Sequence, residues 1–144
     1  MIFIFASAVL SPTENLLSAV ADGSLVRTSL ALVTKSANSP IDLHELTGNN
    51  ALHLATCKRD NAILRLLLDH SRIPIEQTNF EGDTPFILAC RMNRFDNAKL
   101  LIRFCANIRA RSARQGSYAV HFAIRYHSFD FMKFLLRHGH PIEW

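Results

Sequence analysis

Three kinds of side chain in this sequence could carry out chemistry: histidine, cysteine and arginine. The seven histidines raise the question of a metal centre or a catalytic site. His138 and His140 stand two positions apart, but two imidazoles alone make a weak metal site, because zinc sites use three or four protein ligands. The motifs His-Glu-x-x-His, Gly-x-x-x-x-Gly-Lys and Gly-x-Gly-x-x-Gly do not occur. We therefore expect no catalytic residue, no metal and no cofactor, and predict that the protein is not an enzyme.

The cysteines favour a reducing compartment. Cys57, Cys90 and Cys105 contain no Cys-x-x-Cys pair, and their odd number cannot form a closed set of disulfides. Residues 1–10 are apolar and include an Ala-Ser-Ala sequence similar to a cleavage site, but no positive charge precedes the apolar run. This run is also too short to span a bilayer. We predict an intracellular protein, cytoplasmic or nuclear, with no transmembrane span, and secretion directed by residues 1–10 is the alternative.

Arginine is the most informative of the three. Residues 91–144 carry ten Lys or Arg and three Asp or Glu, a balance of +7, whereas residues 1–90 carry six and nine, a balance of −3. Twelve of the sixteen cationic residues are Arg, whose planar guanidinium suits carboxylate or phosphate groups better than Lys does. The C-terminal half is therefore the electropositive end, either as a plain solvated face or as a recognition surface.

A 34-residue repeat must position these side chains. Gly48, Gly82 and Gly116 stand 34 residues apart, and Ala55, Ala89 and Ala123 keep the same spacing. Each glycine precedes a segment of the same shape: Asn-Asn-Ala-Leu-His-Leu-Ala at 49–55, Asp-Thr-Pro-Phe-Ile-Leu-Ala at 83–89, and Ser-Tyr-Ala-Val-His-Phe-Ala at 117–123. A fixed period in this range indicates a stacked array.

The unit resembles the ankyrin repeat, with its glycine turn, its Thr-Pro-Leu-His-x-Ala start of a first helix and a leucine run in a second helix. Residues 80–111 match this pattern best. The resemblance implies an all-α solenoid of helix-turn-helix units joined by hairpin turns. It also implies that His53 and His121 are structural side chains that hydrogen-bond the turn, and that Cys90 is a small buried apolar residue.

The apolar pattern predicts the helices. We expect one helix from the Ser-Pro-Thr-Glu capping sequence at 11–14 to about Asp22, and a second between Gly23 and the 36–40 turn. The later pairs are expected at 50–57 and 61–70, at 84–92 and 96–104, and at 118–126 and 130–138. Residues 1–44 then form a divergent N-terminal capping repeat, and residues 45–144 form three repeats, about 45–79, 80–111 and 112–144, in one continuous domain.

The repeat also predicts a partner-binding surface. Cys57, Arg91 and Arg125 share one repeat position, and the residues that follow them are Lys58, Met92 and Tyr126. By the resemblance, both sets lie at the end of the first helix and face the concave groove through which ankyrin proteins usually bind partners. The predicted site combines these groove residues with the turn tips: Thr47, Asn49, Lys58, Phe80, Glu81, Asp83, Arg91, Met92, Arg114, Gln115, Arg125 and Tyr126. Arg91 and Arg125 are expected to face solvent side by side.

We therefore interpret the chain as a non-catalytic protein-binding module, whether inhibitor, adaptor or effector, for a partner with an acidic and partly apolar surface. The alternative is binding of nucleic acid or anionic lipid through the arginines of the C-terminal half: Arg91, Arg94, Arg103, Arg109, Arg111, Arg114 and Arg125. Self-association is a further expectation, because Phe134, Leu135, Ile142 and Trp144 have no following repeat to cover them.

Overall fold

The computed structural model describes residues 16–34, 43–44 and 46–139. The predicted helix start at 11–14, the apolar residues 1–10 and the side chains of His140, Ile142 and Trp144 lie outside these ranges.

The described residues form a helical solenoid, which confirms the predicted all-α fold class. The helices come in consecutive pairs: α2 (Leu16–Ala21) with α3 (Leu25–Thr34), α4 (Ala51–Thr56) with α5 (Ala62–His70), α6 (Pro85–Arg91) with α7 (Phe95–Arg103), and α8 (Ala119–Arg125) with α9 (Phe129–Arg137). From α4 onward, each helix begins and ends within one residue of its predicted bounds.

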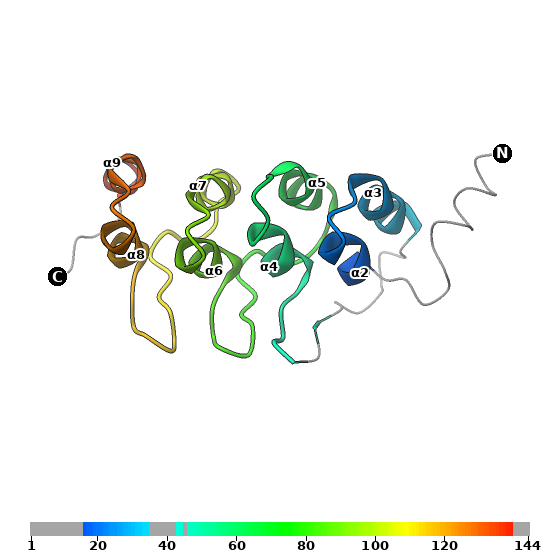
Figure 1. The fold of residues 1–144 in the computed structure, drawn as a ribbon, viewed down its shortest axis with the longest axis horizontal. Helices are drawn as coiled ribbons and strands as arrows, with labels where there is room; N and C mark the ends of the chain where they lie inside the picture. The colour runs from blue at the N-terminus through cyan, green and yellow to red at the C-terminus, as the bar shows by residue number, and fades with distance from the viewer. Residues whose placement is uncertain (1–15, 35–42, 45, 140–144) are drawn as a thin grey trace.

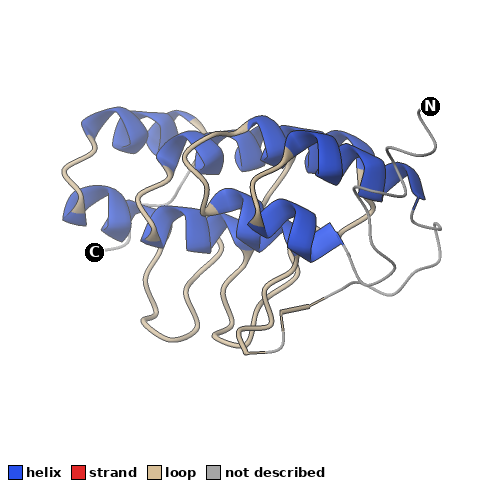
Figure 2. Cartoon of the chain, turned by 45° about the vertical axis from the view of Figure 1, so that its right-hand side comes forward, coloured by secondary structure: helices blue, strands red, loops and turns tan. Residues whose placement is uncertain are grey.

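The pairs stack into two layers. The first helices α2, α4, α6 and α8 lie in one row and the second helices α3, α5, α7 and α9 in the other (Figure 1). Neighbouring first helices contact each other along the whole row, and among the second helices α3 contacts α5 and α7 contacts α9. The loops that lead into α4, α6 and α8 project from the first-helix row as long hairpins, which we call the fingers (Figure 2).

Side-chain caps explain why α4 and α6 begin where they do. The Thr84 hydroxyl accepts a hydrogen bond from the Ile87 N–H at 3.3 Å, and Pro85 follows at the first helical position, where no backbone donor is needed. In the preceding repeat Asn50 replaces this threonine, and its side-chain oxygen accepts from the His53 N–H at 3.0 Å. The departure from Thr-Pro therefore changes the capping group and keeps the cap.

The core is a continuous seam between the two layers. Ala55, Ala89 and Ala123 are fully buried in it, together with larger residues such as Phe86 and Phe122. The Cys90 prediction is confirmed, because this residue is fully buried in the same seam and burial raises the pKa of its thiol.

Replacing Ala89 by leucine should destabilise the whole stack. The alanine has no exposed surface, so three more heavy atoms would force neighbouring helices apart, at a cost of about 1–3 kcal/mol. Because each repeat is stabilised by its neighbours, urea unfolding followed by circular dichroism should shift as one transition. An Ala89→Leu variant with the native urea midpoint would contradict tight packing at the seam.

Candidate functional site

The fingers are closed hairpins. Each tip is joined across its base by a backbone hydrogen bond: His44 N–H to Asn49 O at 2.8 Å, Asn79 N–H to Asp83 O at 3.0 Å, and Ser112 N–H to Ser117 O at 2.9 Å. The repeated glycine of each tip has a positive φ, between 65° and 78°, a conformation that residues with a Cβ rarely adopt. The glycine period detected in the sequence is therefore the period of the fingers.

Neighbouring fingers touch, so their tips form one surface. The Phe80 N–H donates to Thr47 O at 2.9 Å, and the Asn79 amide donates to Asn49 Oδ1 at 2.9 Å. The Phe80 ring also lies against Gly48, where an added Cβ would come within 2.4 Å of the ring. Gly48 is thus required both for its backbone conformation and for the close approach of the next finger.

His53 joins the first helix of one repeat to the finger of the next. Its Nε2 lies 2.9 Å from the Asp83 carbonyl oxygen, which can only accept, so Nε2 carries the proton. Its Nδ1 then accepts from the Asn50 N–H at 3.2 Å. The side chain is fully buried, and desolvation lowers the pKa of the imidazole although the nearby Asp83 opposes this effect. The predicted structural role of His53 is confirmed, and His121 repeats the local part of it by accepting from the Tyr118 N–H at 2.9 Å.

Arg91 is tied to its own finger. Its Nη1 forms an ion pair with Glu81 and lies 3.0 Å from Oδ2 of Asp83. The Asp83 side chain is fully buried, whereas 21% of the Arg91 side chain is exposed. The contact with Asp83 is a charge pairing and not an aligned hydrogen bond, because neither Asp83 carboxylate oxygen has a hydrogen-bond partner among the described residues. The expectation that Arg91 faces solvent is wrong: its charge is required inside the repeat, next to a buried carboxylate.

Glu81 is the acidic centre of the fingers. The hydrogen bond from Arg91 and the charge of this arginine lower the pKa of the Glu81 carboxyl, and Arg114 on the next finger adds to the effect. Arg114 Nη1 lies 3.5 Å from Glu81 Oε1. One carboxylate therefore links the end of α6, the second finger and the third finger.

Arg125 has the same repeat position as Arg91 but a different environment. The third finger carries Gln115 and Ser117 at the positions of Glu81 and Asp83. Within the part of the chain that the structure describes, no carboxylate lies within ion-pair distance of Arg125, which is exposed at the end of α8. Arg91 and Arg125 have the same repeat position, but only the Arg91 guanidinium has carboxylates beside it among the described residues.

Three other side chains at this level connect repeats. The Lys58 ammonium donates to Ala21 O at 2.6 Å, Arg94 Nε donates to Cys57 O at 3.1 Å, and the Tyr126 hydroxyl donates to Arg91 O at 2.8 Å. In each case a donor from one pair reaches the carbonyl at the end of the first helix of the preceding pair. Lys58, predicted as a partner-binding cation, is half-buried and makes this internal contact.

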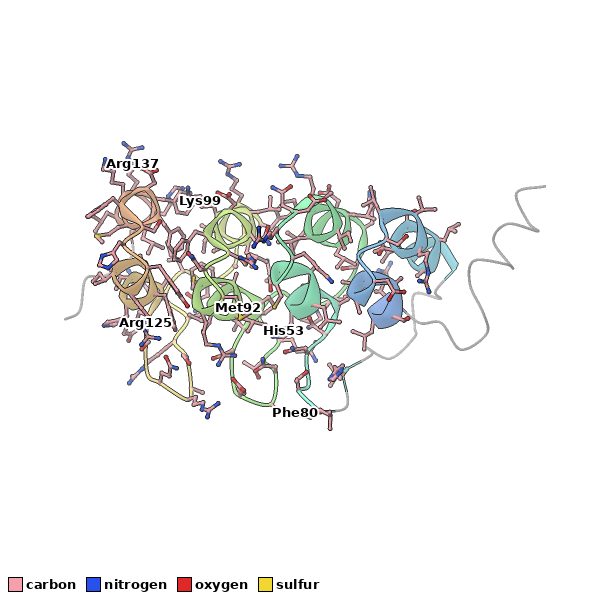
Figure 3. The ribbon with its side chains drawn as sticks, in the orientation of Figure 1. His53, Phe80, Met92, Lys99, Arg125 and Arg137 are labelled. Carbon is pink, nitrogen blue, oxygen red and sulfur yellow. The ribbon has the colours of Figure 1, made fainter. Side chains whose placement is uncertain are left out.

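Exposed apolar side chains lie on the same side of the molecule. Leu46 and Phe80 stand at neighbouring finger tips, and Met92 and Tyr126 at the ends of α6 and α8 are 46% and 40% exposed. Figure 3 shows Phe80 at the end of its finger and Met92 and Arg125 nearer to the first-helix row. We call this surface the finger face: the tips around 46–49, 80–83 and 113–117 with the helix ends at 57–58, 91–92 and 125–126.

The structure divides the twelve predicted site residues into two groups. The exposed members of the finger face are Thr47, Phe80, Glu81, Met92, Arg114, Gln115, Arg125 and Tyr126. Asn49, Lys58, Asp83 and Arg91 are buried or half-buried and bond to other parts of the array. Two residues at the same repeat position are therefore not equally accessible to a partner. The sequence signal that could have separated Arg91 from Arg125 is that the acidic residues Glu81 and Asp83 occur in the middle repeat alone.

The remaining sequence predictions concern metals, membranes and the end of the array. Among the described residues, no three His, Cys, Asp or Glu side chains are grouped so that they could hold a metal ion. None of the helices in residues 16–34 and 51–137 is long and apolar enough to cross a membrane. The prediction that Leu135 is uncovered is wrong, because it is fully buried against the core, and Phe134 is half-buried. The exposed apolar residues of α9 are instead Phe129 and Leu136.

Comparison with known proteins agrees with this architecture. The family described as ankyrin repeats (3 copies) matches residues 16–112 and, in an overlapping match, 75–143. The chain is 30% identical over 121 residues to the chicken (Gallus gallus) nuclear factor NF-kappa-B p105 subunit, covering 76% of this chain and 12% of that protein. It is also 30% identical over 112 residues to the Arabidopsis thaliana E3 ubiquitin-protein ligase XBAT33 (76% and 21%), and 27% identical over 108 residues to the human transient receptor potential cation channel subfamily A member 1 (75% and 9%). The aligned region thus spans about a fifth or less of each of these relatives. The period, the paired helices, the finger hairpins and the family match together place this chain in the ankyrin repeat family.

Proposed function

We propose that this chain is a non-catalytic protein-binding module whose finger face binds an acidic, partly apolar segment of a partner. Ankyrin repeats are generally protein-protein interaction modules, and the proposal assigns the contacts within this one. The observation that carries it is the exposed Arg125 guanidinium, which lies 5.7 Å from the centroid of the Phe122 ring and has no carboxylate within ion-pair distance among the described residues.

The middle repeat supplies an internal template for the contact. There, the arginine at the end of the first helix binds a carboxylate of its own finger, Glu81. One repeat later Arg125 has the same place, but its finger offers Gln115 and Ser117 instead. A guanidinium pairs well with a planar carboxylate and can form two parallel hydrogen bonds with it. A partner carboxylate would therefore take the place beside Arg125 that Glu81 takes beside Arg91.

Apolar groups next to this charge support a protein partner. Met92 and Tyr126 are exposed at the helix ends, and Leu46 and Phe80 are exposed at the tips. Arginine, methionine and aromatic residues are enriched at the centres of protein interfaces. We expect the partner segment to place an acidic side chain at Arg125 and apolar side chains on Met92 and Tyr126.

Binding of nucleic acid or anionic lipid is the second candidate, and the structure weakens its basis. Of the seven arginines considered for it, Arg91 pairs with the carboxylates of Glu81 and Asp83. Arg94 is half-buried and donates a hydrogen bond to Cys57 O. The others are divided between the end of α7, the third finger and the end of α8: Arg103, Arg109, Arg111, Arg114 and Arg125. We also propose, from the cysteine pattern, that the module acts inside the cell. By its resemblance to other ankyrin chains, its role there would be that of an inhibitor, adaptor or effector.

The test supplies Arg125 with an internal counter-charge. The double variant Gln115→Glu with Ser117→Asp rebuilds the middle repeat's arrangement in the third repeat, and Arg125→Glu removes the cation. Both variants should weaken binding of a fluorescein-labelled peptide that carries two adjacent glutamates between leucine and phenylalanine residues. We expect a loss of about tenfold or more, since a charged hydrogen bond contributes about 1.5–3 kcal/mol and about 1.4 kcal/mol is tenfold.

Arg65→Glu is the matched control, because Arg65 is exposed on α5 and all three variants change the net charge by −2. It should bind the peptide nearly as well as the native chain. Equal losses in all three variants would show that net charge, and not the finger face, controls binding. A parallel titration with a labelled oligothymidylate at low and high salt would then decide for the nucleic-acid candidate, whose affinity falls steeply with salt.

A further inference from the structure

Ser117 stands where the middle repeat carries a buried anion. It follows Asp83 by 34 residues, and Arg125 follows Arg91 by the same interval. In the middle repeat the two side chains meet, with Oδ2 of Asp83 3.0 Å from Nη1 of Arg91. The third repeat therefore keeps the cation of this pair and has a hydroxyl in place of the anion.

The backbone around Ser117 follows the backbone around Asp83. Each residue comes after a glycine with positive φ, 78° at Gly82 and 65° at Gly116. Each is followed by the extended residue that begins a first helix, with φ −73° and ψ 162° before α6 and φ −86° and ψ 167° before α8. Because side-chain direction is set by the local backbone, we expect the Ser117 side chain to point toward the end of α8 as the Asp83 side chain points toward the end of α6.

Ser117 differs from Asp83 in its exposure. The Asp83 side chain is fully buried, and Ala113 of the third finger packs beside it on Gly82, where an added Cβ would come within 2.4 Å of the alanine Cβ. Ser117 is only half-buried, and within the described ranges its hydroxyl has no hydrogen-bond partner. A group attached to Ser117 Oγ would therefore have space that the equivalent position in the middle repeat lacks.

The surroundings of Ser117 are positively charged. Arg125 is exposed, and among the described residues no carboxylate lies within ion-pair distance of it. Arg111 Nε donates to Gly116 O at 2.9 Å, and its guanidinium carbon lies 5.8 Å from the centroid of the Tyr118 ring. A second guanidinium is thus held against both chain neighbours of Ser117. A phosphate would suit this place, since it brings three acceptor oxygens and a charge of about −1.5 to −2 at pH 7.

The sequence before Ser117 suits a protein kinase that selects basic substrates. Arg111 and Arg114 precede it by six and three positions, and kinases choose substrates partly by such charge patterns. Ser112 and Ser128 also have an arginine three positions earlier. Ser112 is fully buried, however, and Ser128 has a phenylalanine six positions earlier. Ser117 alone of the three combines both upstream arginines with partial exposure.

From these observations we propose that Ser117 is a phosphorylation site whose phosphate pairs with Arg125. A kinase that selects upstream arginines would use ATP: Ser117 Oγ forms a bond to the γ-phosphorus, and the bond from that phosphorus to the β,γ-bridging oxygen breaks. ADP leaves, and the hydroxyl proton passes to a base of the kinase. The phosphate then takes the place beside Arg125 that a partner carboxylate needs, so phosphorylation releases the partner. This release rests on the proposed function of the finger face, whereas the pairing with Arg125 does not.

A ³¹P NMR titration tests the pairing, with phosphoserine incorporated genetically at position 117. The second pKa of a serine phosphate is ordinarily about 6. A cation beside it favours the dianion, so the pKa should fall by about one pH unit. Arg125→Met should return it toward the ordinary value, and Arg65→Met, at an exposed position on α5, should leave it lowered. An ordinary phosphate pKa, or a lowering that Arg125→Met does not reduce, would overturn the pairing.

A second experiment tests the modification itself. The native chain is incubated with ATP and the catalytic subunit of cyclic-AMP-dependent protein kinase, and the modified residue is located by mass spectrometry. Ser117 should carry the phosphate and the buried Ser112 should not, whereas an unfolded peptide of residues 106–123 should be modified at both serines. Failure to modify Ser117 in the peptide would show that the upstream arginines are not sufficient. Failure in the folded chain alone would show that Ser117 is not accessible, and either result would overturn the assignment.

The effect on binding is measured with the fluorescein-labelled glutamate peptide. Phosphorylation of Ser117 should weaken its affinity by about tenfold or more, as Arg125→Glu does. A Ser117→Ala chain treated with the same kinase should keep its affinity. A lowered phosphate pKa together with unchanged peptide affinity would refute the release of the partner and leave the pairing intact. If the unmodified chain does not bind the peptide, the proposed function fails, and the NMR titration still decides whether the phosphate pairs with Arg125.

Discussion

Replacing Arg91 by methionine is expected to lower the free energy of unfolding by about 2–4 kcal/mol. The substitution keeps the apolar stem and removes the cation that lies 3.0 Å from the fully buried Asp83 carboxylate. Breaking a buried ion pair by removing one partner costs about 3–5 kcal/mol, and we expect less because 21% of the Arg91 side chain is exposed to solvent. Chemical denaturation monitored by circular dichroism gives the value directly.

Two further variants separate the ion pair from a loss of packing. Arg125→Met makes the same change one repeat later, at an exposed site without a carboxylate, and should alter stability by no more than about 0.5 kcal/mol. Adding Asp83→Asn to Arg91→Met removes the orphaned charge and should recover much of the loss. If Arg91→Met and Arg125→Met changed the free energy of unfolding equally, the Arg91 contact with Asp83 would have no structural role.

Replacing His53 by alanine should destabilise the stack by about 2–5 kcal/mol. Without the imidazole the buried Asn50 N–H has no partner, which costs about 1–3 kcal/mol, and the Asp83 carbonyl loses one of its two hydrogen bonds while it keeps the one from the Asn79 N–H. The fully buried site would also keep a cavity. His70→Ala, at an exposed position on α5, is the control and should have little effect. A His53→Ala protein as stable as the control would show that the two hydrogen bonds contribute nothing.

The same histidine predicts a pH dependence. Burial holds the pKa of folded His53 below its ordinary value of 6.5. Above pH 6.5 the imidazole is neutral in both states and does not affect the balance. As the pH falls below 6.5 the unfolded chain binds a proton that the folded chain does not, so the free energy of unfolding decreases until the pH reaches the folded pKa. The native chain should therefore lose more stability between pH 7 and pH 5 than His53→Ala does, and parallel losses would contradict this assignment.

Residues of the same type at equivalent repeat positions have different surroundings in the array. On the finger face, Arg91 belongs to the framework and Arg125 is available to a partner. On the second helices, Phe95 of α7 is 9% exposed and Phe129 of α9 is 68% exposed. In both pairs the residue type is the same and the repeat position is the same, so only the neighbours differ.

The sequence by itself determined the fold and most helix bounds. The 34-residue period, the apolar pattern and the capping residues Asn50 and Thr84 act within a few positions of the chain, and their effect can be inferred without knowing the tertiary contacts. The structural role of His53 followed in the same way, because its bond to Asn50 is local and its family position is marked by the motif.

Only the tertiary structure decided which side chains remain free. The Lys58 ammonium donates to the carbonyl of Ala21, 37 residues away, and the Asp83 side chain is fully buried beside Arg91. Arg125 has no carboxylate of its own finger beside it, because the finger that leads into α8 carries Gln115 where the middle finger carries Glu81. A charge is neutralised, or a ring covered, by whatever the neighbouring finger and the next helix pair bring to it, and those contacts form only when the repeats stack.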